Sequence, residues 1–140
     1  MPLVRISVYS STTSEGRAAI ANAVYEAMRE TIGIPEGDRF IVVTSHGHDE
    51  FFVDPHFMGL DRTERYVLVQ IFLSRGRAVG TKQALYARLA ERLHQAAGIP
   101  KGDVMIVLTE NSYEDWSFGD GVAQYVLNPP AWARKTVEGN

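Results

Sequence analysis

Gly33-Ile34-Pro35-Glu36-Gly37-Asp38 recurs in the chain as Gly98-Ile99-Pro100-Lys101-Gly102-Asp103, at an offset of 65 residues. The same register continues without gaps on both sides and aligns further apolar residues: Leu3-Val4 with Leu68-Val69, Ile6 with Ile71, and Ile41-Val42 with Ile106-Val107. Because two motifs and the runs around them keep one offset, we interpret the chain as an internal duplication.

The apolar pattern of each half predicts a strand, a helix and a second strand. The first half opens on the apolar run Pro2–Tyr9, and the halves close on Phe40–Val43 and Met105–Leu108, which are typical of strands. Apolar residues recur at helical spacing between the strands: Ile20, Val24, Ala27, Met28 and Thr31 in the first half, and Leu85, Leu89, Leu93 and Ala96 in the second.

The ends of the predicted helices carry their own signals. Gly33 and Gly98 are natural helix stops, and each has a proline two residues later. Thr12, with Glu15 three residues on, resembles a capping box at the start of the first helix.

A strand-helix-strand unit makes its two strands parallel, with a right-handed crossover. Two such repeats, about 2–44 and about 67–109, predict an α+β fold built from α/β-type units, with a four-stranded sheet and two helices on one face. No further long helix is predicted to cover the other face, so we expect an oligomer that buries it. We treat 1–140 as a single domain, with a linker at about 45–65 and a tail at about 128–140.

Composition narrows the function. The chain has 140 residues, a net charge of -3 and scattered basic residues, which does not suit a nucleic-acid surface. It has no cysteine, so disulfides and thiolate chemistry are excluded. We find neither a signal peptide nor an apolar run long enough for a membrane span, and therefore expect a cytoplasmic protein.

The linker offers two weaker patterns. Phe51–Val53 is consistent with a short strand. Several potential metal ligands gather nearby: His46, His48, Asp49, Asp54 and His56. Their spacing matches no helix-borne pair, so we favour a polar connecting loop and predict no metal site.

Pro2 follows the initiator methionine directly. Removal of Met1 would leave a secondary amine, which is basic where an amide nitrogen is not. Such an amine serves as a general acid or base, or attacks a carbonyl group, without a cofactor. The alternative is an ordinary strand-initiating proline. The repeat counterpart of Pro2 is Val67, inside a strand, so only one half can carry the amine.

Two further groups are candidates for anion binding and proton transfer. Arg75-Gly76-Arg77 follows a predicted strand, where ligands gather in open α/β sheets, and two guanidinium groups suit one carboxylate. Solvated surface arginines are the alternative. Asp38 and its counterpart Asp103 fit a turn role, although Asp38 near an amine would also hold that amine charged or orient water.

Trp116 and Phe118 lie in a polar, Gly-rich stretch after the last strand rather than on a periodic apolar face. Aromatic side chains in such a loop wall a pocket or fill an interface. The alternative is a plug at the edge of the core.

These features together resemble the tautomerase superfamily and, within it, the malonate semialdehyde decarboxylase family. The residues that carry the resemblance are Pro2, the tandem repeats, Asp38-Arg39-Phe40, Ser74-Arg75-Gly76-Arg77, Glu110-Asn111-Ser112, and Asp115-Trp116-Ser117-Phe118-Gly119. Gly76 stands where that family commonly has proline, and Tyr125 where it usually has phenylalanine.

The resemblance implies a homotrimer and a cofactor-free decarboxylase of a small β-oxo acid, with hydratase or tautomerase side activity. Pro2 would be the catalytic amine, Asp38 its acidic helper, and Arg75 and Arg77 the carboxylate ligands. Trp116, Phe118 and Tyr125 would line the substrate site.

Two other functions stay open. The first is a phenylpyruvate-type tautomerase, or a hydratase of unsaturated acids, on the same scaffold. The second is a non-catalytic trimer that binds a small carboxylate or a protein partner.

Overall fold

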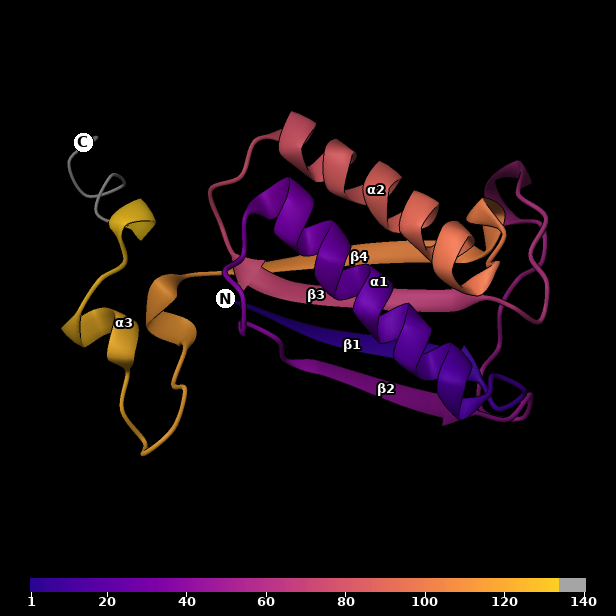
Figure 1. Cartoon of the computed structure of the whole chain (residues 1–140), viewed down its shortest axis with the longest axis horizontal. Helices are drawn as coiled ribbons and strands as arrows, with labels where there is room; N and C mark the ends of the chain where they lie inside the picture. Colours follow the sequence, from indigo (N-terminus) through magenta and orange to yellow (C-terminus); the bar gives the residue numbers. More distant parts are fainter. Residues whose placement is uncertain (134–140) are drawn as a thin grey trace.

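The computed structural model describes residues 1–133 (Figure 1), so the predicted tail lies outside the described residues from 134 on. The strands are β1 (Pro2–Tyr9), β2 (Ile41–His46), β3 (Val67–Ser74) and β4 (Val104–Asn111). The α-helices are α1 (Ser14–Ile32), α2 (Val79–Ala97) and the short α3 (Gln124–Leu127). Three 3-10 turns lie at Phe57–Gly59, Lys101–Asp103 and Tyr113–Asp115.

The four strands form one sheet in the order β2-β1-β3-β4. Strands β1 and β2 run parallel, as do β3 and β4, which confirms a βαβ unit in each half. The two units meet through the antiparallel pair β1–β3, in which Pro2 lies opposite Leu73 and Val8 opposite Val67. The halves of the sheet are thus related by an approximate twofold rotation.

The core lies between the sheet and the two long helices, which cover the same face (Figure 1). Alternate residues of β1 and β3 point into it: Val4, Ile6 and Val8 from β1, and Val67, Val69, Ile71 and Leu73 from β3. Leu85, Leu89 and Leu93 of α2 are fully buried against this layer. The predicted helical spacing therefore identified most of the buried positions, but Ala96, predicted to lie on the apolar face of the second helix, is exposed near its end.

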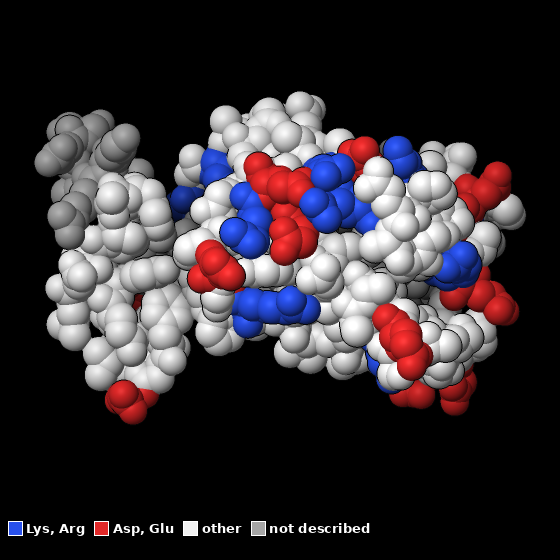
Figure 2. All heavy atoms as spheres, viewed as in Figure 1, with Lys and Arg blue, Asp and Glu red and all other residues white. Residues whose placement is uncertain are grey.

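Polar contacts join the two helices on their outer side. Glu30 of α1 pairs with Arg88 and Arg92 of α2. Figure 2 shows charges of both signs interspersed over this helix-covered face. Among the described residues, the helices are too short or too polar to cross a membrane.

The other face of the sheet is uncovered and carries exposed apolar residues beside polar ones such as Arg5 and Thr109. Leu3, Val42, Met105 and Val107 are exposed there, one or two from each of three strands. Helix α3 does not cover this face, because the segment that carries it lies beside the end of the sheet (Figure 1). The predicted bare apolar face is therefore present in the single chain.

Two local predictions were wrong. The N-cap of α1 is Thr13 rather than Thr12: its hydroxyl accepts a hydrogen bond from the Gly16 N–H at 3.0 Å. Residues 51–53 form no strand, because the Phe51 ring turns inward and packs against Tyr9 and Tyr66 instead of extending the sheet.

Candidate active site

One end of the sheet gathers the candidate residues from four separate segments. Because β1 and β3 are antiparallel, the first residue of β1, Pro2, lies beside the end of β3, where Arg75 follows. Strand β2 begins at the same end, just after Asp38, and β4 finishes there at Asn111. The topology therefore places an amine, a carboxylate and two guanidinium groups at one end of the sheet.

The amino terminus lies against Asp38. The Met1 nitrogen is 3.5 Å from Asp38 Oδ2, and both side chains are mostly shielded from solvent. The other carboxylate oxygen, Oδ1, is buried and has no hydrogen-bond partner among the described residues. Pro2 itself is buried. A carboxylate with an unmatched buried oxygen beside an amine is an acceptor for a proton or for a polar ligand atom.

Residues 75–77, the arginine loop, are held by hydrogen bonds to the strand ends. The Arg75 N–H donates to the Asn111 carbonyl at 2.7 Å, and the Arg77 guanidinium donates to the Ser74 carbonyl at 2.8 Å. Burial lowers the pKa of Arg77, while the charge of Glu110 acts in the opposite direction. The Arg75 side chain is exposed, so its guanidinium is accessible to a ligand.

Gly76 has a φ of +118°. Proline, whose ring holds φ near −65°, cannot adopt that conformation. This loop therefore follows a different backbone path from one that has proline between its arginines.

The aromatic arm, residues 112–133, carries a continuous series of rings. Centroid distances are 5.9 Å from Trp116 to Phe118, 4.7 Å from Phe118 to Tyr125, and 5.8 Å from Tyr125 to Trp132. The three predicted aromatic residues are thus in mutual contact. Trp132 joins them, which sequence reasoning missed because it follows Pro129-Pro130 in a stretch without periodicity.

Tyr125 of the aromatic arm has a perturbed pKa. Burial raises the pKa of Tyr125, and the negative charge of Asp38 raises it further. The phenol therefore lies within electrostatic reach of Asp38. The structure places Pro2, Asp38, Arg75 and Arg77 at one end of the sheet, and Trp116, Phe118 and Tyr125 on the arm that follows β4 from that end.

At the opposite end of the sheet lies Asp103, the repeat counterpart of Asp38. Both aspartates close the same turn, since the Asp38 N–H donates to Pro35 at 3.2 Å and the Asp103 N–H donates to Pro100 at 2.9 Å. Their carboxylates differ. Asp103 is fully buried and accepts hydrogen bonds from the Thr63 N–H and hydroxyl, each at 2.6 Å.

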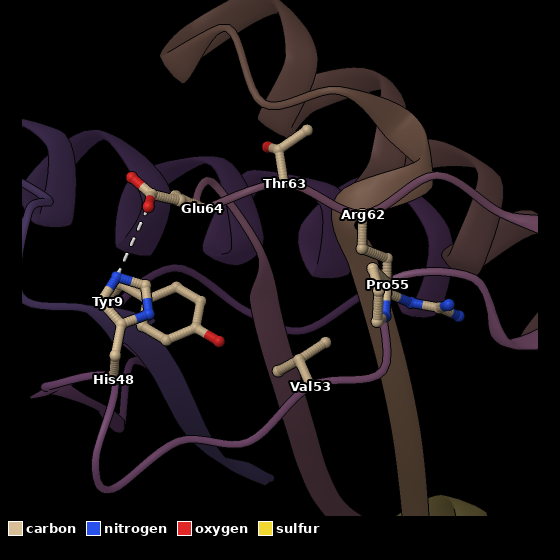
Figure 3. A pocket seen from close by; sticks show the side chains of 7 residues that line it. All are labelled: Tyr9, His48, Val53, Pro55, Arg62, Thr63 and Glu64. Carbon is tan, nitrogen blue, oxygen red and sulfur yellow. Dashed lines mark ion pairs between the residues drawn. The ribbon is translucent and has the colours of Figure 1, made fainter.

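The cavities of the single chain lie at that opposite end. One, of about 200 Å³, is lined by Tyr9, His48, Val53, Pro55, Arg62, Thr63 and Glu64 (Figure 3). There His48 stacks on Tyr9 and pairs with Glu64 at 3.6 Å. Another, of about 220 Å³, adjoins the start of α1. Neither of these two cavities includes Pro2 in its lining.

The linker histidines do not converge on a common point. His48 pairs with Glu64, and His56 lies 3.4 Å from Asp61. Asp54 instead accepts hydrogen bonds from the backbone N–H groups of His56 and Phe57. Within residues 1–133 there is no group of three or more His, Cys, Asp or Glu side chains arranged to hold a metal ion.

Two family models, each described as a tautomerase enzyme, match the chain over residues 2–60 and 38–119. A probable tautomerase of Bacillus subtilis (strain 168), YusQ, is 36% identical over 126 residues, which cover 90% of this chain and 99% of YusQ. The chain therefore belongs to the tautomerase superfamily.

Comparison with solved structures shows which members of the superfamily this chain resembles. The FG41 malonate semialdehyde decarboxylase inhibited by 3-bromopropiolate is 39% identical, with a TM-score of 0.86 over 92% of this chain and 98% of that one. A second malonate semialdehyde decarboxylase, described with decarboxylase and hydratase activities, is 29% identical, with a TM-score of 0.85 over 91% and 98%. Within the superfamily, this chain is malonate semialdehyde decarboxylase-like.

More distant structures share the fold alone. A fused 4-OT symmetric trimer is 21% identical, with a TM-score of 0.74 over 90% of this chain and 98% of that one.

Proposed function

We propose that this protein decarboxylates a small β-oxo acid of the malonate semialdehyde type, using the Pro2 amine that removal of Met1 exposes. The observation that carries the proposal is the convergence of Pro2, Asp38 and the arginine loop at one end of the sheet. The similarity to two malonate semialdehyde decarboxylases over most of the chain supports it.

Decarboxylation breaks the bond between the carboxylate and the α-carbon, and the electron pair of that bond needs an acceptor. A protonated Pro2 amine donates a hydrogen bond to the aldehyde oxygen and stabilises the enolate that forms as CO2 leaves. Alternatively, the neutral amine condenses with the aldehyde and loses water, and the iminium takes up the electron pair. Protonation of the α-carbon gives acetaldehyde, after hydrolysis in the iminium route.

Asp38 acts on the amine in either route. The Met1 nitrogen lies 3.5 Å from its carboxylate, and Pro2 is one residue further along the chain. A negative charge near the Pro2 amine favours its protonated form. The buried, unpaired Oδ1 is available to a water molecule or to the amine proton.

The arginine loop and the aromatic arm have opposed effects on the substrate carboxylate. The guanidinium groups of Arg75 and Arg77 orient the carboxylate through charge-assisted hydrogen bonds. Those bonds also stabilise the group that must leave as neutral CO2. The rings of Trp116 and Phe118 exclude water on one side, which favours the less polar transition state.

We also propose a homotrimer. The exposed apolar residues on the uncovered face of the sheet favour a partner there. A related fold assembles as a symmetric trimer, as fused 4-OT does. Copies packed through this face would bury Leu3, Val42, Met105 and Val107.

A second candidate function is keto-enol tautomerisation, and the name of the curated relative YusQ favours it. In that reaction Pro2 moves a proton between the carbon and the oxygen of a keto acid. The same arginine loop would bind its carboxylate, so the substrate distinguishes the two reactions.

Proton NMR of the purified protein with malonate semialdehyde tests the proposal. Acetaldehyde is expected from the native protein, and none above background from Pro2→Ala. If acetaldehyde does not appear while phenylpyruvate is tautomerised in a Pro2-dependent manner, the second candidate function replaces the first.

A further inference from the structure

Asn111 is the last residue of β4. It contacts both the arginine loop, which follows β3, and the aromatic arm, which follows β4. Its backbone carbonyl accepts the Arg75 N–H at 2.7 Å. Its side-chain Oδ1 accepts the Trp116 indole N–H at 2.9 Å. A single residue therefore holds the start of the arginine loop and the first ring of the aromatic arm.

The bond from Trp116 ties the first ring of the aromatic arm to the end of β4. Other hydrogen bonds of residues 112–127 join neighbours within the arm, such as Phe118 N–H to Gln124 and Gln124 to the Gly119 carbonyl. The rings contact one another in series from Trp116 to Phe118 and from Phe118 to Tyr125, so the placement of Trp116 bears on that of its neighbours.

The neighbour of Asn111 across the sheet also belongs to this junction. Ser74 is the register partner of Asn111, and its carbonyl accepts a hydrogen bond from Arg77. The strand ends therefore place both arginines and the tryptophan on one short, rigid support. The arginine loop and the indole are thus joined through two hydrogen bonds on one residue.

We infer that Asn111 is a positioning residue that couples carboxylate binding at the arginine loop to the placement of the aromatic arm. The inference rests on the proposed function only in taking Arg75 and Arg77 as carboxylate ligands. It extends that function by proposing that Asn111 sets the distance between the arginine loop and the aromatic arm.

The two hydrogen bonds of Asn111 are separable by mutation. Asn111→Ala keeps the backbone carbonyl and therefore the bond from Arg75, but it removes the acceptor of the Trp116 indole. We expect KM to change little, because the arginine loop persists. We expect kcat to fall about tenfold, as is reasonable for the loss of one well-placed hydrogen bond.

The test follows the Trp116 indole N–H resonance by NMR, assigned with Trp116→Phe, while malonate is added as the carboxylate probe. In the native protein, malonate is expected to shift this resonance. In Asn111→Ala, the resonance should move toward that of a free indole and no longer respond to malonate, although malonate still binds.

Two further variants complete the experiment. Asn111→Asp keeps an acceptor oxygen, so the indole resonance and kcat should recover, while KM rises because the added charge competes for the arginines. Gln95→Ala removes an exposed amide on α2, which bonds only Glu91 at 3.4 Å, and should behave as the native protein.

The outcomes separate this inference from the proposed function. The coupling is overturned if malonate fails to shift the resonance in the native protein, if it shifts it equally in Asn111→Ala, or if Asn111→Ala raises KM at unchanged kcat. A malonate response that is lost in Asn111→Ala, in a protein that releases no acetaldehyde, upholds the coupling and rejects the decarboxylase.

Discussion

The repeat motif ends in an aspartate in both halves, and the two carboxylates have taken different roles. Asp103 is satisfied by Thr63 and is part of the structure. Asp38 keeps a buried oxygen that has no hydrogen-bond partner within residues 1–133, and it lies beside the amino terminus. The sequence supports a shared turn for both, and the backbone shows it, but the difference between their side chains depends on the linker residue that reaches Asp103.

We predict different effects for the same substitution at these two aspartates. Asp103→Asn should destabilise the protein by about 1–3 kcal/mol, since its buried hydrogen bonds are disrupted. Asp38→Asn should leave the free energy of unfolding nearly unchanged and lower kcat. Urea unfolding and turnover measured on both variants check this, and a large loss of stability in Asp38→Asn would show that its carboxylate is structural.

The pKa of the Tyr125 phenol provides a second test at the scale of single residues. Burial and the charge of Asp38 both raise its pKa, so its phenol should stay protonated above its ordinary range near pH 10. In Asp38→Asn, that pKa should fall but remain raised, because burial persists. Near-ultraviolet titration, with Tyr125→Phe subtracted, measures the change. An unchanged pKa would place Tyr125 beyond the electrostatic reach of Asp38.

At the scale of elements, periodic segments were predictable and the aromatic arm was not. The helices follow from apolar spacing, and both end at their predicted glycines. The N-cap of α1 differed by one residue because Thr12 and Thr13 carry the same chemistry. Trp132 has no periodic neighbours, so its contact with Tyr125 is visible only in three dimensions.

The helix pair should be sensitive to acid. Arg88 and Arg92 lower the pKa of Glu30 from 4.5 to about 2. Because the folded pKa lies below the unfolded one, the contribution of Glu30 to stability is full above about pH 4.5 and is lost as the pH falls toward 2.

Glu30→Gln should remove that contribution, so the stability difference from the native protein should shrink between pH 5 and pH 2. Thermal unfolding across this range measures the difference. Glu36→Gln, in the exposed turn before β2, is the matched control. A Glu30→Gln difference that does not vary with pH would mean that the ion pairs do not hold the helices together in solution.

For the whole molecule, the bare sheet face has the clearest consequence. Val107→Glu puts a charge into the apolar surface proposed to lie between copies, where an unpaired buried charge is strongly unfavourable. Sedimentation equilibrium should show a trimer for the native chain and smaller species for the variant. Gln95→Glu, on the helix-covered side, should remain trimeric. A native monomer would refute the proposed assembly.

The central claim is that the Pro2 amine performs the chemistry. The most direct measurement compares kcat/KM for malonate semialdehyde between protein that begins at Pro2 and protein that retains Met1, both verified by mass spectrometry. We predict activity only in the form with the free prolyl amine, because in the other form that nitrogen is an amide. Equal activity in the two forms would contradict the account.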